Sequence, residues 1–186
     1  SDLQVDTSSL PATATTTLTL DAVMAESADS TGAYDNPLQT DAAGFWGTGT
    51  GGTTIATAAA DADFSTSTTV YDSRGTPHDV TLVFEQTGPS DWTWYALADA
   101  GEALDNTGTP YGPSGEAFQM ASGTATFNTS GVLTTSTTVN TLNWSFSGAA
   151  AMALTYDFTD LMMGGSEDTI TSIAQDGNGI GDLLSI

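Results

Sequence analysis

Few residues in this sequence could do chemistry, and four of them gather in one segment. Ser73, His78, Asp72 and Asp79 are the residue types of a nucleophile, a general base and an orienting carboxylate. Hydrolytic catalysis requires the serine beside the histidine and the carboxylate behind it. Here all four fall in or beside one predicted hairpin turn, without the strand–turn–helix context of a nucleophile elbow. We therefore interpret the group as a polar turn and predict that the chain is not an enzyme.

A second group of candidate ligands lies near the end of the sequence. Asp176, Asn178 and Asp182 alternate with glycines, as the oxygen ligands of a calcium loop do. A loop of the EF-hand type would also need an oxygen ligand at its fifth position, where Ile180 stands, and a glutamate at its twelfth, beyond residue 186. We predict a Gly/Asn turn with no metal or other cofactor, and keep one calcium site at these three residues as an alternative.

Two tryptophans are spaced so that they could bind a sugar. Trp92 and Trp94 project to the same face of a predicted strand, about 7 Å apart, and such a pair can stack on sugar rings. The residues of the opposite face, Thr93, Tyr95 and Leu97, are not clearly polar. Both faces of this strand are then expected to be buried, so we interpret the pair as part of a core and keep carbohydrate binding as the alternative.

Basic residues are nearly absent. The 186 residues contain 23 Asp and Glu but a single Lys or Arg, which gives a net charge of −22. About 12% acid is ordinary for a soluble protein, so the chain lacks bases rather than carrying an excess of acids. Nucleic acids and anionic membrane surfaces are bound through several Lys and Arg side chains. Because Arg74 is the only such residue in the sequence, both kinds of partner are excluded. One His and no Cys exclude His/Cys zinc sites and thiol chemistry.

Alternating apolar and polar residues predict strands throughout the chain. Residues 65–99 predict a three-stranded antiparallel meander, and Thr159 is expected to cap a short helical turn at 160–163. Further strands are expected at 14–24, 124–128, 132–139, 142–146, 152–158 and 168–174, with another beginning at 181. The fold class predicted is all-β: an antiparallel β-sandwich or partly closed β-barrel of roughly eight to ten strands, with long Gly/Ala/Thr-rich insertions.

The domain organisation follows from where this pattern fails. Residues 1–13 show no sustained period and are expected to form an arm or linker, and residues 14–186 a single domain. Insertions are expected at about 27–64 and 100–115, because both stretches are rich in small and turn-forming residues and the first is too long for an ordinary connection.

Three blocks of the sequence, in the right order, resemble the bacterial flagellar hook protein, specifically its outer FlaE-type β-domain. The entry strand at 14–24 fits the same pattern. The residues that carry the resemblance are Val70, Tyr71, Asp72, Ser73, Gly75, His78, Leu82, Phe84 and Trp92 in the first block; Phe127, Asn128, Gly131 and Leu133 in the second; and Asp157, Phe158, Leu161, Gln175, Asp176 and Gly177 in the third. Asn178 departs from the family, which commonly has a bulky residue there, and the two insertions match no family motif.

The resemblance implies an extracellular structural protein. Hook subunits are exported by the flagellar type III apparatus and form a helical polymer that acts as a flexible universal joint between motor and filament. The chain lacks the terminal coiled-coil segments of the family, so it is expected to be a fragment, monomeric by itself, whose partners in the full-length protein are other hook subunits. Outward-facing Thr, Ser and Asn would supply shifting polar contacts between subunits, and repulsion between like-charged copies would make the polymer sensitive to salt and divalent cations.

A rival interpretation from another class is a secreted calcium- or glycan-binding β-module of the adhesin or surface-layer type. The acidity of the chain, its Thr content and its lack of Cys are equally typical of such modules. The order of the three motif blocks favours the hook interpretation.

Overall fold

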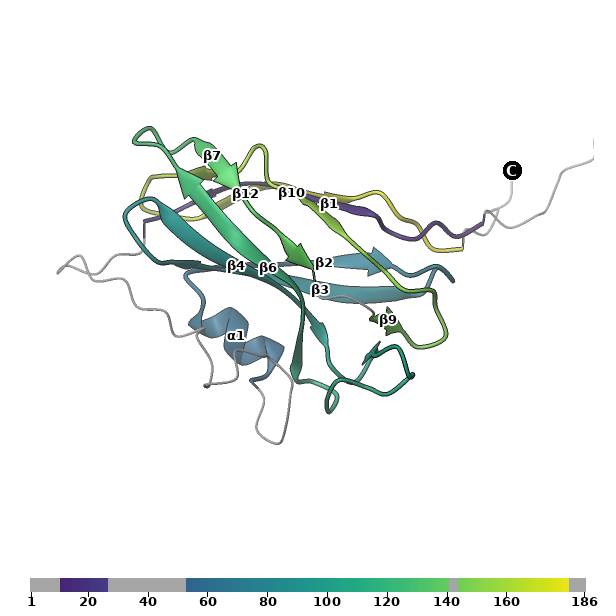
Figure 1. Cartoon of the computed structure of the whole chain (residues 1–186). Coiled ribbons are helices and arrows are strands. Elements are labelled where there is room, and N and C mark those ends of the chain that lie inside the picture. The colour runs from purple at the N-terminus through teal and green to yellow at the C-terminus, as the bar shows by residue number, and fades with distance from the viewer. Residues whose placement is uncertain (1–10, 27–52, 141–143, 181–186) are drawn as a thin grey trace, which may run out of the picture.

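The computed structural model describes residues 11–26, 53–140 and 144–180, and within them the chain is built almost entirely of strands (Figure 1). None of the helices in these ranges is long and apolar enough to cross a membrane. The elements are β1 (Thr17–Met24), α1 (Ile55–Asp61), β2 (Phe64–Tyr71), β3 (Pro77–Gln86), β4 (Asp91–Asp99), β5 (Ala103–Leu104), β6 (Ala117–Phe127), β7 (Leu133–Ser136), β8 (Val139–Asn140), β9 (Ser145–Phe146), β10 (Thr155–Asp157), β11 (Met162–Met163) and β12 (Thr169–Gln175).

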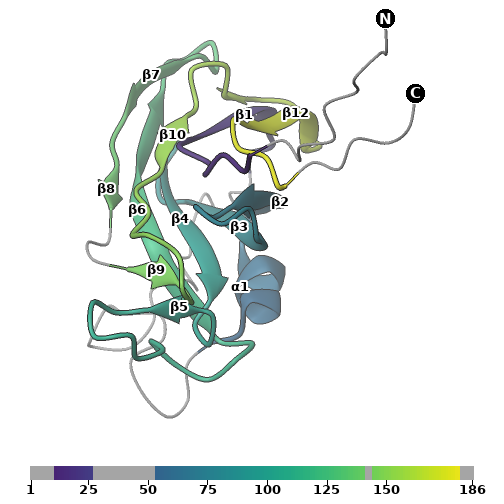
Figure 2. The same ribbon diagram turned by 90° about the vertical axis from the view of Figure 1, so that its right-hand side faces the viewer.

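The larger sheet is antiparallel and has the strand order β2-β3-β4-β6-β7, with β8 also pairing with β6. Its first three strands are the meander predicted for residues 65–99, with Val70 opposite His78 and Phe84 opposite Trp94. The sheet curls so that one face wraps around the core (Figure 2). The all-β prediction is therefore confirmed.

The smaller sheet is centred on β1. Strand β12 pairs with one side of β1 in the antiparallel sense, whereas β10 and β11 both pair with the other side in the parallel sense. The two short strands run in the same direction because a turn at residues 158–161 only interrupts the chain between them. A third pair, β5 with β9, forms a separate two-stranded sheet.

The helical turn expected at 160–163 is wrong. Met162 and Met163 pair as a strand with Val23 and Met24. The turn before them is held by Asp157, whose Oδ1 accepts from the backbone N–H (3.0 Å) and the hydroxyl (2.6 Å) of Thr159. Thr159 is thus the donor in an Asx turn formed by Asp157, and it does not cap a helix.

The hydrophobic core lies between the two sheets. Strand β1 alternates strictly between half-buried and buried residues, and its buried members Leu18, Leu20 and Met24 face the curled sheet. Trp94 packs against Phe158 with ring centroids 5.0 Å apart in an edge-to-face arrangement. Trp92 and Trp94 are 1% and 0% exposed, so both belong to the core and neither presents a ring to a sugar.

Helix α1 covers the outer face of the curled sheet and was not foreseen from the sequence. Thr54 caps it, its Oγ1 accepting from the backbone N–H of Thr57 (3.1 Å). Ala58 is buried in a second apolar cluster with Val83 and Leu97 of β3 and β4. Strands β3 and β4 are therefore covered on both faces, which explains why their sequence lacks a clean polar side.

Candidate functional site: the neck between the two chain ends

The first and last described residues of the chain run side by side. The backbone N–H of Thr13 donates to the carbonyl of Asn178 (3.0 Å), and the N–H of Asn178 donates back to the carbonyl of Thr13 (2.9 Å). We call residues 11–16 and 175–180 together the neck. Because β1 and β12 are antiparallel partners, the two segments of the neck lie at the same end of the domain.

A carboxylate near the C-terminal side of the neck binds the backbone at the start of β1. Asp176 Oδ1 accepts from the N–H groups of Thr16 (2.7 Å) and Thr17 (2.9 Å), and Oδ2 accepts from the Thr16 hydroxyl (2.5 Å). These bonds, led by the one from the Thr16 hydroxyl, favour the ionised form and lower the pKa of Asp176 to about 2. The Asp176 carboxylate thus holds the backbone at the start of β1 against the C-terminal segment of the neck.

Thr15 joins the neck to β2. The residue is buried, and its hydroxyl donates to Gln175 Oε1 (2.7 Å) while accepting from the backbone N–H of Tyr71 (2.9 Å). The N–H of Thr15 in turn donates to the carbonyl of Tyr71 (2.8 Å). Gly177 makes this approach possible, because a Cβ there would lie 2.4 Å from Thr15 Oγ1. The neck is therefore joined to both sheets.

The β2–β3 turn braces the neck from the side. Gly75 has φ +78°, and a Cβ on it would lie only 2.6 Å from the Cβ of Ala12. Asp72 shapes the turn by accepting, at Oδ1, from the N–H groups of Arg74 (2.8 Å) and Thr76 (2.9 Å). Burial opposes ionisation of Asp72, but these bonds and the neighbouring His78 outweigh it and lower the pKa of the carboxyl.

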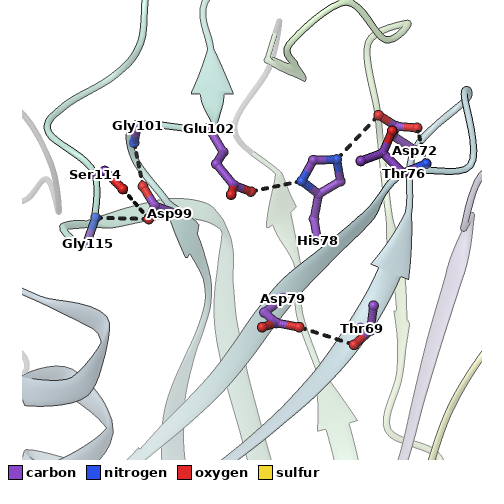
Figure 3. A network of polar contacts seen from close by, with 10 residues as sticks. All are labelled: Thr69, Asp72, Thr76, His78, Asp79, Asp99, Gly101, Glu102, Ser114 and Gly115. Atoms are coloured by element: carbon purple, nitrogen blue, oxygen red, sulfur yellow. Dashed lines mark hydrogen bonds and ion pairs between the residues drawn. The ribbon is translucent and has the colours of Figure 1, made fainter.

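His78 connects this turn to the loop after β4 (Figure 3). Its Nε2 lies 3.3 Å from Asp72 Oδ2, and its Nδ1 lies 2.9 Å from Glu102 Oε2. The imidazole also stacks on the ring of Phe146, with centroids 3.5 Å apart and planes 5° from parallel. One side chain thereby holds together β3, the turn before it, the β4–β5 loop and β9.

The geometry does not form a nucleophilic site. Ser73 Oγ accepts from the backbone N–H of Ala150 (2.8 Å), and Asp79 Oδ1 accepts from the Thr69 hydroxyl (3.1 Å). Both ring nitrogens of His78 face carboxylates instead. The serine–histidine contact that nucleophilic catalysis needs is not among the contacts of these residues.

The calcium candidates are placed only in part. Asp176 binds β1 as described, Asn178 Nδ2 donates to the carbonyls of Pro11 (3.2 Å) and Gly179 (2.8 Å), and Asp182 lies outside the described residues. Within the described ranges no group of three or more His, Cys, Asp or Glu side chains is arranged to hold a metal ion.

The remaining motif residues support the fold around the neck. Gly131 has φ +75°, and the N–H of Met163 donates to its carbonyl (2.8 Å), which docks the β6–β7 hairpin on β11. Asp157 holds the turn before β11, as described above. Five others are buried in the core: Val70, Phe84, Trp92, Phe127 and Phe158.

A polar groove of about 740 Å³ lies beside the β2–β3 turn and is lined by residues of β2, β3 and the loop after β4. His78, Asp79, Asp99 and Glu102 contribute to its lining. Asp99 accepts from the N–H groups of Gly101 (2.7 Å) and Gly115 (2.9 Å), so its carboxylate is held by the loop. The carboxylates of Asp79 and Glu102 also have protein partners, which are Thr69 and His78 respectively. The groove is a structured loop surface with negative charge.

These features define an all-β domain whose two ends meet at a single braced neck. The sequence model of the family described as Flagellar basal body protein FlaE D2 domain matches residues 40–178, and the chain belongs to this family. Two curated relatives, both named Flagellar hook protein FlgE, come from Salmonella typhimurium and Salmonella typhi; each is 31% identical over 118 residues, which is 63% of this chain and 27% of the relative. The chain thus spans about a quarter of the length of these relatives.

One solved structure with a similar chain is the 32 kDa fragment of the flagellar hook protein FlgE from Caulobacter crescentus. It is 18% identical, has a TM-score of 0.49, and the match covers 62% of this chain and 47% of that one.

Several residues of the site could not be picked out from the sequence. Thr15 lies at the start of the strand expected at 14–24, and Glu102 lies in the insertion expected at about 100–115. Each acquires its role from a partner far away in the chain: Gln175 for Thr15, and His78 for Glu102. The position of Thr15, just before the alternating run of β1, is the one sequence signal that could have drawn attention to it.

Proposed function

We propose that this chain is the outer domain of a bacterial flagellar hook subunit, with a structural and not an enzymatic role. The match of the FlaE D2 family over residues 40–178 carries the proposal. In this role the domain belongs to an extracellular helical polymer of like subunits, exported by the flagellar type III apparatus, and it binds neither nucleic acid nor membrane. The scarcity of bases supports the last point.

The neck supports the same proposal in mechanical terms. A domain of a bending polymer must be held in a defined orientation by its connections, and here both chains enter together and are bound to β1, β2 and the β2–β3 turn. We keep residues 1–13 as the arm and 14–186 as the domain, with insertions at about 27–64 and 100–115; α1 and β5 fall within these stretches. The family-motif residues then serve the neck and core, not a reactive site.

Genetic replacement tests the proposal directly. A full-length hook gene carrying this domain should restore hooks and swimming to a strain without its own hook gene, whereas deletion of residues 14–178 should leave hooks that are thin or mechanically defective. Normal hook diameter and normal swimming after the deletion would contradict a structural role for the domain.

The alternative, a secreted calcium- or glycan-binding module, makes a different prediction. A ligand that binds only the folded state raises its melting temperature through linkage. A shift of many degrees between calcium and a chelator would favour the alternative, and equal melting temperatures favour the hook proposal. Trp92 and Trp94 lie in the core, which removes the aromatic platform for a glycan.

A further inference from the structure

The negative charge of this chain is distributed unevenly. Residues 117–156 form a run of 40 positions without a single Asp, Glu, Lys or Arg. At the average of the whole chain, 23 acids in 186 residues, a run of this length would hold about five acids. The run comprises β6, β7, β8 and β9 and ends within β10.

Within this run, one edge of the curled sheet is exposed and uncharged. Strands β7 and β8 both pair with β6 on the side away from β4, so they form the last strands of the sheet. Residues 134–139 are all exposed Thr, Ser or Val, and Val139 is 67% exposed. Among the described residues, the turn between β6 and β7 contacts β11, where Val132 bridges to Met162 and Gly131 accepts from Met163. We call residues 134–139 the β7–β8 edge.

A second uncharged edge belongs to the smaller sheet. Strand β12 pairs with β1 on one side and, in the described part of the chain, with no strand on the other. Its seven residues, TITSIAQ, carry no charge, and five of them are exposed, including Ile170 at 45%. Figure 2 places β7 and β8 on one side of the molecule and β12 on the opposite side.

Uncharged exposed edges are unusual because they invite pairing. An edge strand presents free backbone N–H and C=O groups, and proteins that stay apart protect such edges with charged side chains or proline. No charged residue or proline lies within β12 or the β7–β8 edge, although the exposed Glu167 and Asp168 directly precede β12 and Asp176 directly follows it. In a chain with a net charge of −22, the uncharged β7–β8 edge can approach β12 of a second copy closely without placing carboxylates against carboxylates.

We propose that the β7–β8 edge of one copy of this chain packs against the β12 edge of a second copy. The inference rests on the proposed hook function and deepens it by naming the surface. Two different patches on opposite sides make a head-to-tail contact, which generates a helical polymer where the rotation between copies does not close a ring. Because the contact consists of Thr and Ser hydroxyls with few apolar anchors, it resists bending less than a hydrophobic interface of the same area.

Charge substitution in the full-length hook protein tests this contact. Thr135→Asp in β7 and Thr171→Asp in β12 each add one carboxylate at an exposed position. We expect each to reduce the number of assembled hooks, seen by electron microscopy, by roughly two- to fivefold at low salt, with recovery at high salt. Asn106→Asp, in the exposed loop after β5, adds the same charge away from both edges and should leave hook number unchanged.

A compensating pair separates direct contact from indirect effects. Thr171→Lys should restore hook number in the Thr135→Asp background, and it should not rescue Asn106→Asp if that variant shows any loss. Equal secretion of all variants shows that export is intact, and equal melting temperatures of the purified monomers show that folding is intact.

Normal hook numbers at low salt for both single variants would overturn the edge contact while leaving the hook function standing. Failure of the unmodified gene to form hooks at all would instead remove the proposed function. Loss of hooks without rescue by Thr171→Lys would also count against pairing of these two edges.

Discussion

The carboxylate of Asp176 binds Thr16, 160 residues earlier in the chain, through both of its oxygens: Oδ1 accepts from the backbone N–H and Oδ2 from the hydroxyl. This relationship joins the last turn of the described chain to the beginning of its first strand. It also gives an acidic residue, in a chain that contains a single Lys or Arg, a purely structural partner: the N–H groups at the start of β1. The neck therefore depends on ionisation of one carboxyl group.

Replacing Asp176 by Asn should destabilise the domain. The amide keeps the shape of the side chain but loses the charge that strengthens its bonds from Thr16 and Thr17. We expect the free energy of unfolding to fall by roughly 1–2 kcal/mol, the lower part of the range for hydrogen bonds to charged groups because the site is exposed. Chemical denaturation of the purified domain measures it, and Asp160→Asn, an exposed carboxylate, is the control.

The acid dependence of stability should change in the same variant. The folded pKa of Asp176, about 2, lies below the ordinary value of 3.8, so its contribution is complete above the unfolded pKa and is lost as the pH falls from about 4 to about 2. The free energy of unfolding should decline less steeply over this interval in Asp176→Asn than in the unmodified domain. Parallel curves for the two proteins would show that the carboxylate is not bound to β1.

Thr15→Val should cost more than its small change in volume suggests. Valine has the shape of threonine, but it leaves the backbone N–H of Tyr71 without its acceptor, whereas Gln175 Oε1 keeps the bond from the N–H of Gly177 (2.6 Å). A loss of about 1–3 kcal/mol in the free energy of unfolding is expected, the cost of one unsatisfied buried donor. Thr15→Ser retains the hydroxyl and should recover most of the stability; equal losses in both variants would point to packing instead.

Gly131→Ala should be poorly tolerated because of what lies above the glycine. A Cβ there would fall on the carbonyl oxygen of Met163, and φ is +75°. Gly108 has a similar φ of +83° with nothing within 4 Å of such a Cβ. Gly108→Ala should therefore cost about 1 kcal/mol for the backbone alone, and Gly131→Ala about 2–4 kcal/mol with the added displacement of β11. Equal thermal shifts for the two would contradict the docking of the hairpin.

His78→Phe should destabilise the domain more than Glu102→Gln. Phenylalanine can still stack on Phe146, but buried Asp72 loses its side-chain partner. We expect about 1–3 kcal/mol for the loss at the buried end and less than about 1 kcal/mol for Glu102→Gln, whose side chain is 54% exposed. The reverse order in denaturation experiments would place the important contact at the loop after β4.

The sequence predicted the long strands because their alternation is set by burial of one face. In β1, Leu18 and Leu20 alternate with threonines. The register with β12 could not be predicted, because it shifts between Asp21 and Ala22 and β12 is mostly exposed. Helix α1 was missed because seven residues rich in Ala carry too little periodicity to stand out. The parallel pairing of β10 and of β11 with β1 could not be predicted either, since two or three residues define no strand direction.

The family resemblance drew attention to residues that the structure places in or around the neck, but it did not give their hydrogen-bond partners. Asp72, Gly75, His78, Asp176 and Gly177 were all singled out by the family resemblance. Whether the carboxylate of Asp176 would bind a cation or the protein's own backbone depends on Thr16, and no local pattern encodes a partner so distant. The same holds for Ser73, whose partner Ala150 is 77 residues away.

The hydrogen bonds between Thr13 and Asn178 also make the domain modular. Everything between these two residues could be exchanged for a relative's domain, or for a short turn, without altering the separation of the two connecting chains, because that separation is the width of one backbone pair. A change in the size or charge of this domain can then accumulate without any adjustment in the chain that carries it. The neck is therefore the place at which this domain can be removed or replaced, in evolution or by design.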